Sequence, residues 1–153
     1  GLPASLNTIL KNALGKYFVR VDADDYVSKH FLYFLSVFLD MNSGSRVMGT
    51  EHFYQAIACD YFKTDETGQL VSRHISYKEP IACGIMFRMQ HLLDIGLYDE
   101  KFKYAEEEAL RRKFMKKYKI TRIPLSMYRY RQHEANRSKN KKQVNKFSKL
   151  VNK

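Results

Sequence analysis

Three carboxylates stand within four residues, directly after a short apolar segment. The acids are Asp22, Asp24 and Asp25, and the segment 17–21 before them alternates as a strand with one buried face does. Like charges this close repel one another, so a compensating charge is expected. Mg²⁺ or Mn²⁺ would supply it, because both ions prefer carboxylate oxygens. A solvated turn, in which Asp25 or Ser28 caps the next helix, fits the residue types equally well.

A second acidic group stands at the start of a helix predicted over about 105–118, where three glutamates follow one another from Glu106. At about 100° per residue, Glu107 lines up best with the apolar face and Glu108 faces away. An inward carboxylate at a helix start can be partly desolvated and act as a general base. The helix dipole also favours acids here, and Glu107 and Glu108 each precede an arginine by four residues, the spacing of surface ion pairs. The pattern alone favours this surface role.

The third group lies at the end of the last predicted strand, where residues 128–133 read Tyr-Arg-Tyr-Arg-Gln-His. Arg131 and His133 share one side of an extended segment. Together they could hold a diphosphate or complete a metal shell. An edge strand with inward aromatic residues and solvated basic residues is an equally good interpretation.

Helices and strands must position these groups, and their order predicts an α/β protein with a mixed β-sheet flanked by helices. Helices are predicted over 3–14, 29–41, 90–94 and 105–118, and strands over 17–21, 46–49, 53–62, 70–77, 85–88, 120–123 and 126–131. The turn at 65–68 should join two of these strands in a hairpin. The helix 29–41 is apolar around most of its circumference and should be deeply packed. Pro124 should separate the last two strands at a bend.

Composition limits the alternatives. The chain of 153 residues fits one domain, and its longest apolar run, 31–39, is too short to span a bilayer. Cys59 and Cys83 have apolar neighbours and no CxxC spacing, which indicates reduced core cysteines and argues against zinc. The net charge of +11 is concentrated after residue 135, where seven basic residues and no acid occur. Such a tail can contact nucleic acid, anionic lipid or an acidic partner, or remain solvated.

The order of several short motifs resembles the centre of a family 2 glycosyltransferase with the GT-A fold. The resemblance covers about residues 1–136, and no single motif carries it. The motifs are Asn7, Ala13-x-Gly15-Lys16-Tyr17, Val21-Asp22-Ala23-Asp24-Asp25, Gly84-Ile85-Met86-Phe87-Arg88, Ile95-Gly96-Leu97-Tyr98-Asp99-Glu100-x-Phe102, Glu106-Glu107 and Tyr130-Arg131-x-His133.

The resemblance implies inverting transfer of a sugar from a nucleotide-sugar donor to an acceptor hydroxyl, in the synthesis of a cell-surface glycan or polysaccharide. It implies that Asp22, Asp24 and Asp25 face the donor and a divalent metal, Mg²⁺ or Mn²⁺. Arg131 would assist at the donor diphosphate, and His133 would join Asp24 at the metal. The catalytic base would be Glu107.

This sequence departs from the family pattern in three respects. The base is usually aspartate, so Glu107 adds one methylene, and an aromatic residue usually stands where Arg111 is. Such enzymes also begin with strand–helix–strand units that hold the nucleotide base, and this chain starts after them. We therefore expect a partial GT-A domain over 1–136, in a fragment of a longer enzyme or in one that works with a partner, followed by a basic tail over 137–153.

The expected partners are a nucleotide-sugar donor and a glycan or lipid-linked acceptor, rather than nucleic acid. The expected location is the cytoplasm, with the tail contacting the inner face of the membrane. Two other functions remain open. One is a glycoside hydrolase that pairs Asp22 or Asp24 with Glu107. The other is a non-catalytic module that binds nucleic acid or membranes through its tail. The hydrolase leaves the motif order unexplained, and the module leaves the acidic groups unexplained.

Overall fold

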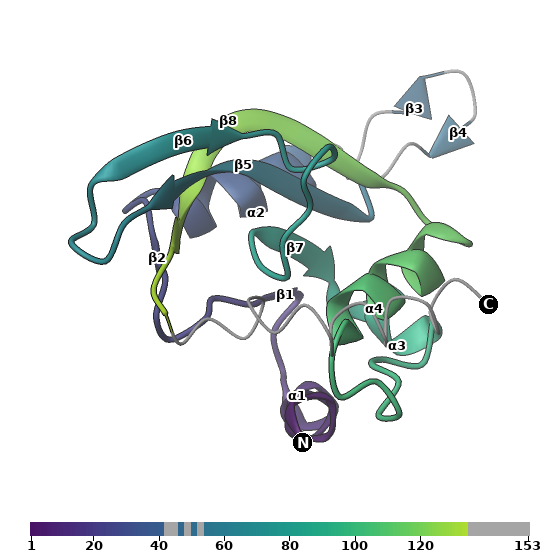
Figure 1. Cartoon of the computed structure of the whole chain (residues 1–153). Helices are drawn as coiled ribbons and strands as arrows, with labels where there is room; N and C mark the ends of the chain where they lie inside the picture. The colour runs from purple at the N-terminus through teal and green to yellow at the C-terminus, as the bar shows by residue number, and fades with distance from the viewer. Residues whose placement is uncertain (42–45, 48–49, 52–53, 135–153) are drawn as a thin grey trace.

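The computed structural model describes residues 1–41, 46–47, 50–51 and 54–134 (Figure 1). The expected tail at 137–153, and with it the expected domain boundary after residue 136, lies outside these residues. The elements are, in chain order, α1 (Leu2–Asn12), β1 (Tyr17–Val19), β2 (Tyr26–Val27), α2 (Phe31–Met41), β3 (Arg46–Val47), β4 (Thr50–Glu51), β5 (Ala56–Thr64), β6 (Leu70–His74), β7 (Ile85–Arg88), α3 (Met89–Asp94), α4 (Glu106–Met115) and β8 (Ile120–Arg131).

One curled sheet organises the chain. Its strands run in the order β1-β7-β5-β8-β2, and β6 pairs with β5 off this path. The pairing of β5 with β8 is parallel, whereas the other described pairings in this sheet are antiparallel. The strands β3 and β4 form a separate antiparallel pair. A mixed sheet with flanking helices confirms the predicted fold class.

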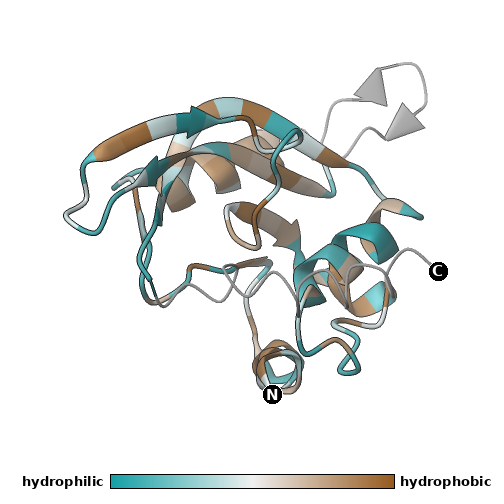
Figure 2. Ribbon diagram, viewed as in Figure 1, coloured by the Kyte–Doolittle hydropathy of each residue, from teal (hydrophilic) through white to brown (hydrophobic). Residues whose placement is uncertain are grey.

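The sheet is buried on both faces because side chains alternate along its central strands. Ala56 and Ala58 of β5 join the cluster beneath α1, α3 and α4, while Ile57 and Cys59 join the cluster beneath α2. Figure 1 shows α2 behind the sheet and the other three helices on its opposite side. Hydrophobic residues accordingly follow one another along β5 and β7, whereas the outer side of α4 is hydrophilic (Figure 2).

The predicted hairpin is confirmed, because β5 and β6 pair from Tyr61↔His74 to Thr64↔Leu70 around a turn. In that turn the amide of Gly68 donates to the carbonyl oxygen of Asp65 at 3.1 Å, and Gly68 has a φ of 89° that suits glycine. The predicted helices at 3–14, 90–94 and 105–118 also correspond to α1, α3 and α4.

Two predictions were wrong. The segments 120–123 and 126–131 form one strand, β8, because Ile123 pairs with Cys59 and Ser126 with the next residue of β5. Pro124 and the residue after it form an exposed bulge in which proline needs no ladder partner.

The helix α2 is also less deeply packed than its composition predicts. Only Phe31, Leu35 and Leu39 are buried among its residues, whereas Leu32 and Tyr33 are 58% and 62% exposed. One face of the helix covers the sheet, and the described residues do not cover the other. The amide of His30 donates to the Ser28 hydroxyl at 3.3 Å, so Ser28, not Asp25, occupies the start of α2.

Candidate functional site

The acidic turn connects β1 to β2, and the pairing of β2 with β8 places the end of β8 beside it. Within the turn the amide of Asp25 donates to the carbonyl oxygen of Asp22 at 3.0 Å. The strand β2 begins at the next residue, and Tyr26 pairs with Arg129 of β8. The antiparallel pairing of β2 with β8 thus brings the acidic turn and the group at residues 128–133 together.

Asp25 holds this junction together. Its two carboxylate oxygens accept hydrogen bonds from the Tyr128 hydroxyl at 2.7 Å and from the backbone amide of Arg131 at 2.8 Å. The Tyr128 oxygen in turn accepts the amide of Asp22 at 3.2 Å. Burial raises the pKa of Asp25, although both hydrogen bonds oppose this shift. Asp25 therefore fixes the turn against β8.

Asp24 points to a different place. Its Oδ2 lies 2.7 Å from Nε2 of His133, and both side chains are partly exposed. The hydrogen bond from His133 lowers the pKa of Asp24, so this carboxylate is ionised at neutral pH. Both residues line an open polar pocket of about 560 Å³ together with Glu66, Arg131 and Glu134. Three carboxylates line it with one arginine and one imidazole, so a phosphorylated ligand would need a bound cation to offset the acids.

Arg20 joins the acidic turn to the start of α4. Its Nε and Nη2 donate to the two oxygens of Asp22 at 2.7 and 3.1 Å. Its Nη1 donates to Glu106 at 3.3 Å and lies 4.0 Å from Glu107. The Arg20 side chain is only 13% exposed, so these charge interactions are weakly screened by water.

Glu107 is a buried carboxylate with one hydrogen-bonded oxygen and one oxygen that the described residues leave unpaired. Its Oε2 accepts a hydrogen bond from the Tyr98 hydroxyl at 3.0 Å, whereas Oε1 has no hydrogen-bond partner among the residues that the structure describes. Burial raises the pKa of Glu107 to about 7, against the opposing effects of Arg20 and Tyr98. A carboxyl group that changes protonation near neutral pH is suited to general base catalysis.

A chain of hydrogen bonds from α1 holds Glu107 in place. The backbone amide of Tyr98 donates to Oδ1 of Asn7, and Nδ2 of Asn7 donates to the Tyr98 carbonyl oxygen, both at 3.0 Å. Burial and the negative charge of Glu107 raise the pKa of Tyr98, which keeps its hydroxyl protonated as a donor. Ala105, the residue before α4, adopts a left-handed φ of 58°, a strained conformation of the kind often found next to functional residues.

The residues around Asp24 fit a divalent cation. Asp24 and His133 offer a carboxylate oxygen and an imidazole nitrogen that are hydrogen-bonded to each other at 2.7 Å, and a cation would replace this hydrogen bond. A carboxylate together with an imidazole suits Mn²⁺ better than the harder Mg²⁺.

A second group of donor atoms fits a hard cation poorly. Asp22, Asp25 and Cys83 have donor atoms within 4.8 Å of one another. Both oxygens of Asp22 already accept from Arg20, and both oxygens of Asp25 accept hydrogen bonds. Burial raises the pKa of Cys83 well above its ordinary value, so its sulfur is a neutral thiol. Cys59 and Cys83 are both buried and free of disulfides.

Comparison with solved structures identifies the fold. No protein-family model and no curated protein matches the sequence. Among solved structures, the chain is similar to residues 1–349 of TarS from S. aureus, a wall teichoic acid glycosyltransferase, with a TM-score of 0.67 and 18% sequence identity. The fold is glycosyltransferase-like. The match covers 99% of this chain and 44% of the TarS chain, so this chain spans less than half of that structure.

The structure brings Asp22, Asp24, Asp25, Arg131 and His133 to one end of the sheet, and Arg20 links this cluster to Glu107. The burial of Glu107 agrees with its place on the apolar face of the helix, whereas the surface role that the pattern favoured for Glu107 was wrong. Glu108 is half-buried and pairs with the arginine four residues on, as its outward position predicts.

The sequence analysis missed Arg20, and it placed Tyr98 and Tyr128 in motifs without predicting a role for either tyrosine. A signal existed for Arg20, because residues two apart on an extended segment share a side and Asp22 stands two positions later. No comparable signal marked the roles of the two tyrosines, which depend on contacts with residues far away in the sequence.

The helices that the structure describes lack the length and the apolar character needed to span a membrane.

Proposed function

We propose that this chain carries the metal-facing and base-carrying part of an inverting glycosyltransferase that uses a nucleotide-sugar donor. One observation carries the proposal: Glu107, a buried carboxylate with an oxygen unpaired within the described chain, is linked through Arg20 to an acidic turn in a glycosyltransferase-like fold. The acceptor would be a hydroxyl group of a glycan or a lipid-linked glycan, in the synthesis of a cell-surface polysaccharide.

Each residue would have its own role in sugar transfer. Oε1 of Glu107 removes the proton from the acceptor hydroxyl, whose oxygen then forms a bond to the anomeric carbon as the bond to the diphosphate breaks. Attack opposite to the leaving group inverts the configuration. Arg131 donates hydrogen bonds to the diphosphate in the open pocket, with Asp24 and His133 beside it. Asp22 and Asp25 hold the acidic turn in position beside the donor.

Asp24 and His133 would hold the divalent cation, which when bound neutralises negative charge on the leaving diphosphate. The other function classes have less support in the structure. The basic tail that a non-catalytic module would use lies outside the described residues, and the Glu107 arrangement would have no purpose in such a module. Contact of the tail with a membrane surface remains part of the proposal.

The pH dependence of turnover should reveal Glu107. Because the base must be deprotonated to act and burial raises the pKa of Glu107 to about 7, kcat/KM should rise with pH and level off above about pH 7. Tyr98→Phe removes the hydrogen bond that stabilises the charged form of Glu107, so the rise in kcat/KM should move to higher pH. Initial rates of nucleoside diphosphate release between about pH 5.5 and 8.5, roughly 1.5 units on either side of the pKa, would test this. A flat profile would exclude Glu107 as the base.

Asp24→Asn should weaken Mn²⁺ binding by about tenfold or more and abolish turnover, because an amide is a poorer ligand than a carboxylate. His133→Gln should weaken Mn²⁺ binding in the same direction. The free Mn²⁺ signal in electron paramagnetic resonance measures the affinity without any turnover. Asp94→Asn is the charge-matched control, since Asp94 lies at the end of α3 and pairs with Lys117. Unchanged Mn²⁺ affinity in Asp24→Asn would refute the assignment.

A further inference from the structure

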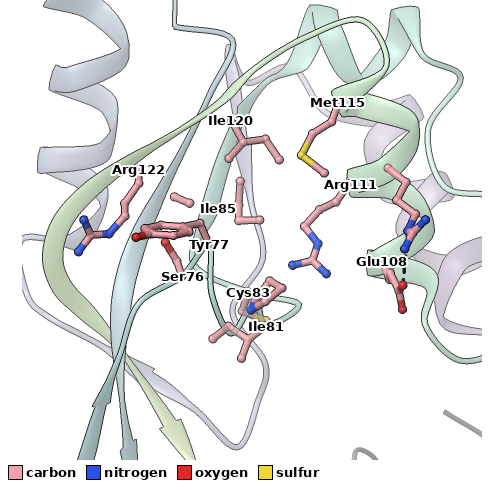
Figure 3. Close-up of a pocket in the computed structure, with 13 residues that line it drawn as sticks. Ser76, Tyr77, Ile81, Cys83, Ile85, Glu108, Arg111, Met115, Ile120 and Arg122 are labelled. Atoms are coloured by element: carbon pink, nitrogen blue, oxygen red, sulfur yellow. Dashed lines mark ion pairs between the residues drawn. The ribbon is translucent and has the colours of Figure 1, made fainter. Parts of the chain in front are cut away.

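A second pocket, of about 470 Å³, lies between the sheet and α4 (Figure 3). Its apolar walls include Ile81, Ile85, Met115 and Ile120. Its volume is within the range of ligand-binding pockets, roughly 300–1,000 Å³. Three arginines also line this space, together with the polar or charged side chains of Ser76, Tyr77 and Glu108. The arginines differ in whether they have partners within the protein.

Two of these arginines are already neutralised. Arg122 forms two hydrogen bonds with Asp60, at 2.8 and 2.5 Å, and its guanidinium stacks 5.6 Å from the centre of the Tyr77 ring. Arg112 pairs with Glu108 at 3.4 Å, on the outer side of α4. Figure 3 shows Glu108 on a different side of the helix from the one on which Arg111 extends.

Arg111 is the arginine without such a partner. Its side chain projects from α4 into the pocket towards Cys83 and Ile81 (Figure 3). No residue in the described part of the chain forms a hydrogen bond or an ion pair with its guanidinium, and the side chain is half-buried where it lines the pocket. Burial lowers the pKa of Arg111, against the opposing charges of Glu107 and Glu108. A half-buried guanidinium is only partly hydrated, and an anion in the pocket would supply the acceptor that the described residues do not.

The pocket adjoins the proposed reaction centre. Arg111 lies four residues after Glu107, so the two side chains share a side of α4, one turn apart. Cys83 lines the pocket and also lies within 4.8 Å of donor atoms of Asp22 and Asp25. A ligand that occupies the pocket would therefore extend towards Glu107.

We propose that this pocket binds an anionic group of the acceptor, a phosphate ester or a carboxylate, through paired hydrogen bonds from the Arg111 guanidinium. The planar fork of arginine suits both groups, and the apolar walls exclude the water that would compete for the anion. Identifying the ligand as the acceptor rests on the proposed function, whereas the anion site itself rests on the pocket and Arg111.

Titration with small anions tests this inference without a donor or any turnover. Inorganic phosphate, dimethyl phosphate and acetate would be added to the full-length protein that carries this chain, and binding would be followed by ³¹P or ¹³C line broadening. Arg111→Gln should weaken binding of the preferred anion by about tenfold, and Arg111→Lys by less, because lysine keeps the charge but lacks the fork. Tighter binding of dimethyl phosphate than of acetate would identify the anionic group as a phosphate ester, and the reverse order would identify it as a carboxylate.

Arg112→Gln is the matched control, since it removes the same charge from the same helix and should change binding by less than about twofold. Equal loss in Arg111→Gln and Arg112→Gln, or no loss in either, would overturn the proposal. A measurement on the unmodified protein adds a second check: phosphate should slow the reaction of phenylglyoxal with Arg111 but not with Arg112, and equal protection contradicts the proposal. If these tests fail, the anion site is refuted and the proposed function is not. If anions bind through Arg111 but the protein shows no turnover, the transferase function is refuted and the anion site is not.

Discussion

Replacing Glu107 with glutamine should abolish sugar transfer by the full-length protein that carries this chain, lowering kcat by about a thousandfold or more. Glutamine has the shape of glutamate, and its carbonyl oxygen can still accept the hydrogen bond that Tyr98 donates to Oε2. It cannot take a proton from the acceptor. Release of nucleoside diphosphate from a panel of nucleotide-sugar donors, with and without acceptor, measures the loss.

Glu108→Gln is the control for this change, because Glu108 is the next residue on α4 and its carboxylate pairs with Arg112 on the helix surface. It should keep nearly full activity.

The pH dependence of stability separates a chemical effect of Glu107→Gln from an effect on folding. The folded chain holds the Glu107 proton up to about pH 7, whereas the unfolded chain releases it near 4.5, so stability is lost as pH rises through this window. Glu107→Gln should lack this loss. Activity near that of wild type in Glu107→Gln would exclude the proposed base.

Replacing Arg20 with methionine should lower the free energy of unfolding by about 3 kcal/mol at pH 7, because it leaves buried carboxylates without their cation. Arg20 is 13% exposed at its side chain and contacts Asp22 and Glu106, with Glu107 at 4.0 Å. Methionine fills a similar volume, so the loss reports charge rather than packing. Urea unfolding followed by circular dichroism measures it.

The loss should shrink towards pH 5, because burial raises the pKa of Glu107 to about 7, so Glu107 is already protonated in the unmodified protein at pH 5 and Arg20 has one charged partner fewer to lose. Arg112→Met removes an arginine from an exposed ion pair and should cost less than about 0.5 kcal/mol. An Arg20→Met variant no less stable than Arg112→Met would show that Arg20 does not link the turn to α4.

Local patterns predicted much of the fold and the site. The hairpin of β5 and β6 follows from its turn residues, and the inward position of Glu107 follows from helical geometry. The resemblance of the ordered motifs to glycosyltransferases agrees with the fold of TarS. These features depend on residues close together in the sequence or on their order along the chain.

The features that could not be predicted depend on distant contacts. Nothing in the pattern of α2 shows that only Phe31, Leu35 and Leu39 meet the sheet, because periodicity does not reveal how much of an apolar helix finds a partner. The bulge at Pro124 is decided by the register with β5, and proline alone indicated only a break. The hydrogen bond from Tyr98 to Glu107 arises from the packing of α4 against the segment before it.

The parallel pairing of β5 with β8 has a consequence for how the protein folds. Ala56 pairs with Ile120, so the centre of the sheet forms only when a long loop closes, and such non-local contacts slow folding. Asp24 meets His133 only after β8 is in place, because the strand delivers its far end to the turn. The hairpin of β5 and β6 can form early and locally. The reactive arrangement of charges therefore assembles last, after the slow closure of the sheet.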